Sequence, residues 1–121
     1  MKTKTKFDLE ERTAIFGENT VKFCKKLPKN SVSNPIISQL IRSATSVGAN
    51  YSEADDAESR NDFKHKIGIC KNEARESKHW FRMIAIACTE SKEEARVLWQ
   101  EAKELNLIFN AIINSTNKNK N

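Results

Sequence analysis

The chain has 121 residues, the length of a single domain with one core. Its three Gly and two Pro are too few for the turns of a β-rich fold, whereas 31% charged residues is typical of long solvated helices. No apolar run approaches the roughly 18 residues that a membrane span requires. The basic N-terminus leads into no apolar signal core. We therefore expect a cytoplasmic protein without an export signal or membrane contact.

The formal net charge is +5 and it is unevenly distributed. Residues 1–30, 59–90 and 91–121 are net basic, whereas residues 31–58 are net acidic. A protein with basic and acidic segments can bind polyanions, and it can also bind copies of itself.

Apolar residues recur every three or four positions in four successive segments, which predicts four helices. The expected helices span about 8–27, 35–57, 60–89 and 92–113. Three of them follow a capping-box pattern, Asp8-x-x-Glu11, Ser59-x-x-Asp62 and Ser91-x-x-Glu94. The second helix has Asn34 as its expected N-cap and Pro35 in the first turn. The polar residues 114–121 are expected to form a flexible tail.

The spacing of the apolar residues and the short connections predict an all-α, antiparallel, up-down-up-down four-helix bundle with left-handed packing, in one domain over residues 1–113. Within the second helix, Ala44, Gly48 and Ser52 recur every fourth residue and form a ridge of small side chains. Such a ridge permits close approach to a neighbouring helix, at a helix-propensity cost of about 1 kcal/mol for Gly relative to Ala.

At about 100° per residue, the helix over 60–89 carries two surfaces besides its apolar face. One, which we call the basic stripe, contains Arg60, Lys64, Lys71, Arg75, Lys78 and Arg82. It is either a solvated flank that pairs with acidic residues of neighbouring helices, or a ridge that binds phosphates through counterion release. No aromatic residue is interleaved with it, so we do not expect base stacking, and binding should be directed to the backbone.

The other surface, which we call the third face, places apolar side chains beside carboxylates: Asp62, Lys66, Ile69, Glu73, Glu76, Trp80 and Met83. Its exposed apolar residues are either a scattered set, which is ordinary on a protein surface, or part of a subunit interface.

The segments Arg42–Ala54 and Ser59–Phe63, with Lys66, Glu73-Ala74 and Glu76-Ser77, carry a resemblance to a known family. They resemble the four helix bundle proteins encoded by intervening sequences in bacterial large-subunit (23S) rRNA genes. The accessory subunit of diversity-generating retroelements is a more distant likeness. The resemblance implies a homopentameric ring, with Arg42, Asn50 and Glu53 joining the third face as structural contacts. It also implies binding to structured RNA or DNA.

Catalysis and metal binding are not expected. The two histidines, His65 and His79, lie about four turns apart, and no HExxH, Cys cluster or phosphate-binding glycine motif occurs. Cys24, Cys70 and Cys88 are expected to be buried free thiols. No cofactor is implied. The leading hypothesis is a non-enzymatic, self-assembling bundle that binds nucleic acid non-specifically through its basic surface. The alternative is an oligomeric scaffold that binds only protein, in which acidic residues of neighbouring subunits pair with the basic stripe.

Overall fold

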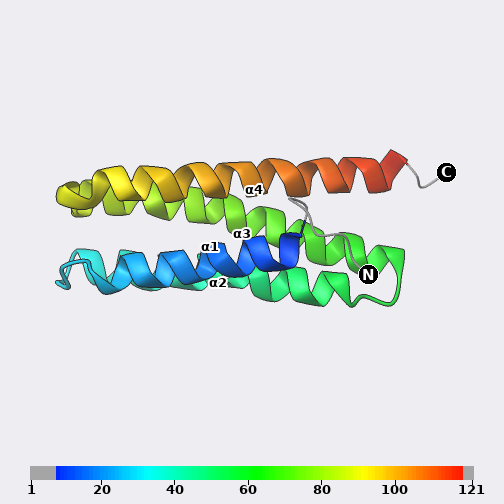
Figure 1. Ribbon diagram of the computed structural model, residues 1–121, viewed down its shortest axis with the longest axis horizontal. Coiled ribbons are helices and arrows are strands. Elements are labelled where there is room, and N and C mark those ends of the chain that lie inside the picture. Colours follow the sequence, from blue (N-terminus) through cyan, green and yellow to red (C-terminus); the bar gives the residue numbers. More distant parts are fainter. Residues whose placement is uncertain (1–7, 119–121) are drawn as a thin grey trace.

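The computed structural model describes residues 8–118. These residues form four long helices. The helices are α1 (Leu9–Lys25), α2 (Ser33–Asp55), α3 (Arg60–Ala87) and α4 (Lys92–Lys118), with the 3₁₀ helix η1 (Thr89–Ser91) before α4. They lie side by side along the long axis of the molecule, and each packs against the next in the chain (Figure 1). The predicted up-down four-helix bundle is confirmed. Within residues 8–118, no helix is long and apolar enough to cross a membrane.

Side-chain caps start two of the helices as the sequence predicts. The backbone N–H of Glu11 donates to Asp8 Oδ1 at 3.3 Å, and that of Asp62 donates to Ser59 Oγ at 3.0 Å. These bonds satisfy donors that a helix N-terminus otherwise leaves unpaired. Ser91 lies inside η1, so α4 begins as a continuation of a tighter 3₁₀ turn.

The expected cap of α2 is wrong. The helix begins at Ser33, one residue before Asn34, and Asn30 supplies the side-chain acceptor. Asn30 Oδ1 accepts from the backbone N–H groups of Val32 and Ser33, both at 2.9 Å. Asparagine readily accepts from the backbone two residues on, so the turn before the helix takes over the role of the cap.

Residues 114–118, expected in a flexible tail, instead continue α4 to Lys118, whereas residues 119–121 lie outside the described part of the chain. Lys64 Nζ in α3 donates to Asn117 Oδ1 at 2.5 Å, and Ile112 and Ile113 pack against the core. These tertiary contacts favour helix in a polar segment whose composition alone does not predict it.

The predicted apolar stripes of all four helices meet in one core. Its largest fully buried side chains include Phe16, Phe23, Phe81 and Phe109, each at most 1% exposed. The rings of Phe16 and Phe81 meet edge to face, with centroids 6.1 Å apart. Helix α1 packs mainly against α2 and contacts α4 over a shorter stretch.

Candidate nucleic-acid interface

The basic stripe runs beside α4, along the line where α3 and α4 meet, which we call the α3–α4 seam. Lys64, near one end of the stripe, donates to Asn117 of α4. Further along, Asn106 Nδ2 of α4 donates to the backbone carbonyl of Lys71 at 2.9 Å. The stripe therefore borders the core on the side of α4.

Lys64 donates to an amide oxygen, and four further stripe cations form neither an ion pair nor a side-chain hydrogen bond among residues 8–118: Lys71, Arg75, Lys78 and Arg82. Pairing with acidic residues of neighbouring helices, one of the two interpretations of the stripe, does not occur for these four cations in the described part of the chain. Their positive charge is presented to solvent along one side of the bundle.

Three of the four carboxylates of α4 face α1 and the turn after it, and the fourth, Glu93, lies 3.9 Å from Arg96 of its own helix. Arg12 contacts Glu101 at 2.7 Å and Glu104 at 2.9 Å, and Lys26 contacts Glu94 at 2.7 Å. Hydrogen bonding to Glu101 is the main cause that raises the pKa of the Arg12 guanidinium. Helix α4 is thus acidic toward α1 and basic toward α3.

No aromatic side chain is interleaved with the stripe on α3 itself, but α4 places one beside it. The centre of the Trp99 ring lies 5.8 Å from Lys78 Nζ and 5.7 Å from Lys103 Nζ. A pocket of about 370 Å³ beside it is bordered by Trp99 and by Arg82, Lys92 and Arg96. The pattern of α3 alone cannot reveal this site, because it arises only when the two helices pack. Trp99 directly follows the core residue Leu98, which is the one sequence signal that it borders a seam.

The third face lies along the other edge of α3, where it meets α2. The Arg42 guanidinium of α2 contacts Glu73 at 3.2 Å and also pairs with Glu76. Trp80 Nε1 donates to Glu76 Oε2 at 2.9 Å, and the Trp80 ring packs against the core. These predicted interface residues therefore connect two helices of the same chain.

The other members of the predicted interface set lie on the same two helices, α2 and α3. Lys66 Nζ contacts Glu53 Oε1 at 2.5 Å. Asn50 Nδ2 donates to the carbonyl and the hydroxyl of Ser46, both at 2.9 Å, within α2. The remaining members are exposed or half-buried and have no side-chain partner among the described residues: Asp62, Ile69 and Met83. Contact of this set with another subunit stays a prediction.

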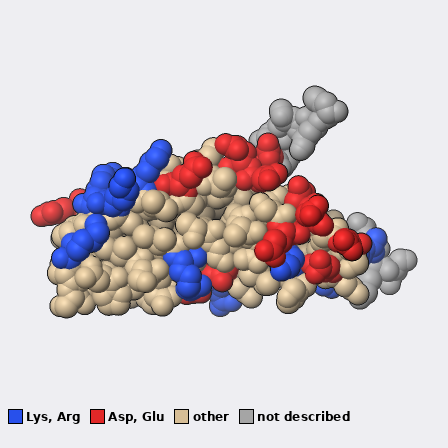
Figure 2. All heavy atoms as spheres, turned by 90° about the horizontal axis from the view of Figure 1, so that it is seen from below, with Lys and Arg blue, Asp and Glu red and all other residues tan. Residues whose placement is uncertain are grey.

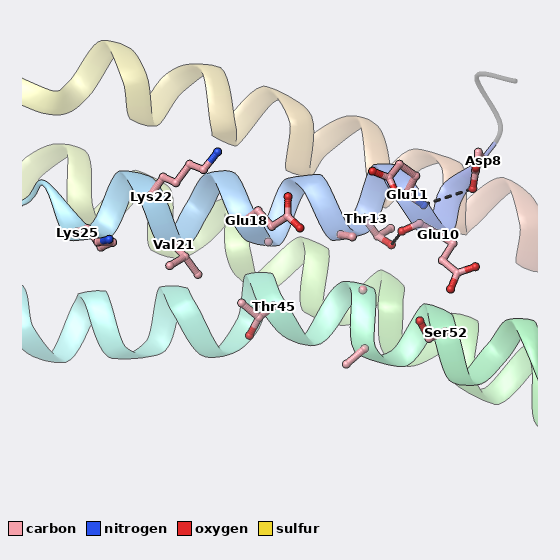
Figure 3. A pocket seen from close by; sticks show the side chains of 14 residues that line it. Asp8, Glu10, Glu11, Thr13, Glu18, Val21, Lys22, Lys25, Thr45 and Ser52 are labelled. Atoms are coloured by element: carbon pink, nitrogen blue, oxygen red, sulfur yellow. Dashed lines mark hydrogen bonds between the residues drawn. The ribbon is translucent and has the colours of Figure 1, made fainter. Parts of the chain in front are cut away.

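A groove of about 720 Å³ lies between α1 and α2, on the far side from the α3–α4 seam. Glu10 and Glu11 stand near one end of it and Lys22 and Lys25 near the other (Figure 3). On the face seen from below in Figure 2, the largest group of Lys and Arg side chains lies toward one end and most Asp and Glu side chains lie toward the other, with some of each sign between them. Both signs of charge share this face, whereas the basic stripe consists of Lys and Arg alone.

The three cysteines are buried free thiols, as the sequence predicts. Burial raises the pKa of Cys24 to about 11 and that of Cys70 to about 12. Both are therefore protonated at neutral pH and are poor nucleophiles or metal ligands. Among residues 8–118 no group of three His, Cys, Asp or Glu side chains is arranged to hold a metal ion.

Comparisons with known proteins agree with this architecture. A crystal structure of a protein of unknown function from the S23 ribosomal protein family of Bacteroides thetaiotaomicron is 28% identical to the chain, with a TM-score of 0.75. The alignment covers 87% of this chain and 97% of that one. No curated protein matches the sequence. The model of the 23S rRNA-intervening sequence protein family matches residues 5–111. The chain therefore belongs to the 23S rRNA-intervening sequence protein family.

Proposed function

We propose that the protein is a non-enzymatic, self-assembling helical bundle that binds nucleic acid through the α3–α4 seam. The observation that carries the proposal is the row of stripe cations without carboxylate partners in the described part of the chain: Lys71, Arg75, Lys78 and Arg82. Helix α4 adds Lys92, Arg96 and Lys103 beside this row.

The length of the row suits a run of phosphates. Positions 71 to 82 span about 16 Å at 1.5 Å per residue. Along the duplex axis one strand carries a charge roughly every 3.4 Å, so a stretch of duplex as long as the row contains about five phosphates of that strand. Affinity from such contacts comes from counterion release, which carries no sequence information. Binding is thus salt-sensitive and tolerant of sequence.

Self-assembly would strengthen this binding. Five copies of a +5 chain would carry about +25, and a field of that size attracts polyanions and raises their rate of association. The family resemblance supports a pentamer, and the half-buried Ile69 and Met83 of the third face support an interface between copies.

The alternative, a scaffold that binds only protein, has one observation in its favour. The α2–α3 turn is acidic, and Glu53, Asp56, Glu58 and Asp62 border one hollow there. If this end of one copy docks on the basic stripe of the next, its carboxylates pair with the stripe cations, and no site for nucleic acid is left.

Fluorescence anisotropy with labelled RNA and duplex DNA, over a series of salt concentrations, tests the proposal. We expect the quadruple variant with Lys71, Arg75, Lys78 and Arg82 changed to Gln to bind more weakly. Its plot of log affinity against log salt should be flatter by up to about 0.9 per lost phosphate contact on duplex DNA. Light scattering and far-UV circular dichroism must first show that the assembly and the helices are intact.

A matched pair of variants separates a local site from net charge. Arg75→Gln with Arg82→Gln and Lys22→Gln with Lys25→Gln each remove two positive charges, but the second pair lies beside the α1–α2 groove. We expect only the first pair to lower affinity substantially. Equal losses from both pairs, or no binding by the parent protein at low salt, would overturn the proposal. In the second case the scaffold alternative holds.

A further inference from the structure

The α3–α4 seam contains a feature that binding to phosphates alone does not require. Beside Trp99 the pocket of about 370 Å³ reaches down to Phe81, Ala85 and Ala95, of which Phe81 and Ala95 are each 1% exposed. Its mouth is bordered by the exposed cations Arg82, Lys92 and Arg96. An apolar base below a cationic rim suits a ligand that is flat and apolar at one end and anionic at the other.

Trp99 differs from the other tryptophan of the chain in its polar partner. Trp80 Nε1 donates to Glu76, whereas Trp99 Nε1 has no acceptor among residues 8–118. No buried polar side-chain atom in that range lacks a partner, so the Trp99 N–H reaches solvent. The ammonium groups of Lys78 and Lys103 lie near the limit of about 6 Å for a cation–π contact, and they hold the ring only weakly.

We infer that the Trp99 pocket binds an unpaired nucleobase, so that the protein prefers single-stranded nucleic acid over duplex. The inference rests on the proposed function and names the substrate class of the same surface. In a duplex the faces of each base are covered by its neighbours, whereas an unpaired base can stack on an aromatic ring. The pocket volume lies near the lower end of the roughly 300–1,000 Å³ in which proteins hold small organic molecules, which suits one nucleotide.

The surrounding charges fit the remainder of that ligand. With a base against Trp99, the flanking phosphates would lie near Arg82 and Arg96 at the rim, and the strand would continue along Lys78 and Arg75. An acidic peptide could use the cations equally well, but it supplies no planar ring for the apolar part of the pocket.

Tryptophan fluorescence provides a direct measurement. In a Trp80→Phe variant the one remaining tryptophan is Trp99. We expect a single-stranded oligonucleotide of eight residues to quench its emission, and an abasic strand of the same length and charge to leave the emission nearly unchanged. Poly-glutamate tests the acidic-peptide alternative. If it binds as tightly as the oligonucleotide and changes the emission equally, the inference is overturned.

Affinities of the full-length protein complete the test. Trp99→Leu should weaken binding of the single strand about five- to hundredfold, the range expected for one lost stacking contact, and leave binding of the abasic strand unchanged. Trp99→Phe should retain part of the affinity, which also guards against a Leu variant that folds poorly. Equal affinity of the parent for the base-bearing and abasic strands, unchanged by Trp99→Leu, would overturn the inference and leave the proposed function standing. Failure of the parent to bind any strand would overturn both.

Discussion

Gly48 of α2 lies directly against the backbone of Thr13 in α1. A Cβ atom at position 48 would stand 3.3 Å from the Thr13 carbonyl oxygen, closer than most such contacts. The two helices are also close at a second position, where a Cβ atom on Gly17 of α1 would stand 3.5 Å from Thr45 Cα in α2. Two glycines, one on each helix, therefore set the separation between α1 and α2.

Replacing Gly48 by a large side chain should separate these helices. We expect Gly48→Leu to lower the free energy of unfolding by roughly 1–3 kcal/mol, the usual cost of overpacking. Gly68→Leu is the matched control, because no atom beyond the local backbone of α3 lies within 4 Å of a Cβ built at position 68. It should be neutral or stabilising, since Leu favours helix more than Gly does. Thermal melts followed by circular dichroism compare the two, and a melting temperature unchanged by Gly48→Leu would contradict the close contact.

The ion pairs of Arg12 should make the packing of α1 on α4 sensitive to acid. Hydrogen bonds from Gln100 and Arg12 lower the pKa of Glu104 below its ordinary value of 4.5. A carboxylate with a lowered pKa contributes stability that is present above its ordinary pKa and is lost as the pH falls through the folded value. At pH 7 we expect Arg12→Gln to destabilise the fold by about 1 kcal/mol. The difference from the parent should shrink as the pH falls below 4.5.

Urea unfolding between pH 7 and pH 3 measures this effect. Lys26→Gln is the control, because its pair with Glu94 joins the same two helices but is more exposed. It should cost less than Arg12→Gln throughout. A pH dependence that is identical in the parent and in Arg12→Gln would show that this cluster does not stabilise the bundle.

The buried thiols should resist modification while the protein is folded. Burial raises the pKa of Cys24 to about 11 and that of Cys70 to about 12, so even at pH 9 little thiolate forms at either. Cys70 Sγ also lies 3.6 Å from the carbonyl oxygen of Val47 in the core. We expect slow reaction with an aromatic disulfide reagent in buffer and rapid reaction of all three thiols in guanidinium. Fast labelling of Cys24 or Cys70 in the native protein would contradict the burial.

The periodicity of the sequence was sufficient to predict the bundle and most of its core. Leu40, Ala44 and Val47 are fully buried, and the apolar stripes of the other helices meet them. This succeeds because the side-chain direction on a helix follows from spacing alone. Gly17 shows the limit, because its close approach to Thr45 depends on how two helices are aligned, and no regular spacing marks it.

The candidate site was predicted only in part, for the same physical reason. The basic stripe lies on one helix, so its spacing reveals it. Trp99 joins the stripe from α4, and the carboxylates of Glu101 and Glu104 turn away from it toward Arg12. Both facts depend on which face of α4 meets α3, which is a tertiary property. Likewise, Arg42 and Glu73 were expected at a subunit interface, but within one chain they already pair across α2 and α3.

Assembly of the protein is the prediction that the third face supports. Light scattering at micromolar concentration should give a mass several times the 13.8 kDa of one chain. Met83→Glu is the sharpest variant, because Met83 is half-buried but does not belong to the core cluster, whereas Trp80 packs on that core and donates to Glu76. A charge at position 83 should therefore dissociate the assembly while helicity persists, since an unpaired charge is costly in an apolar interface. Asn19→Glu, at an exposed position of α1, adds the same charge and should leave the mass unchanged. A monomeric parent would contradict self-assembly itself. A Met83→Glu variant as large as the parent would show instead that copies meet through another face.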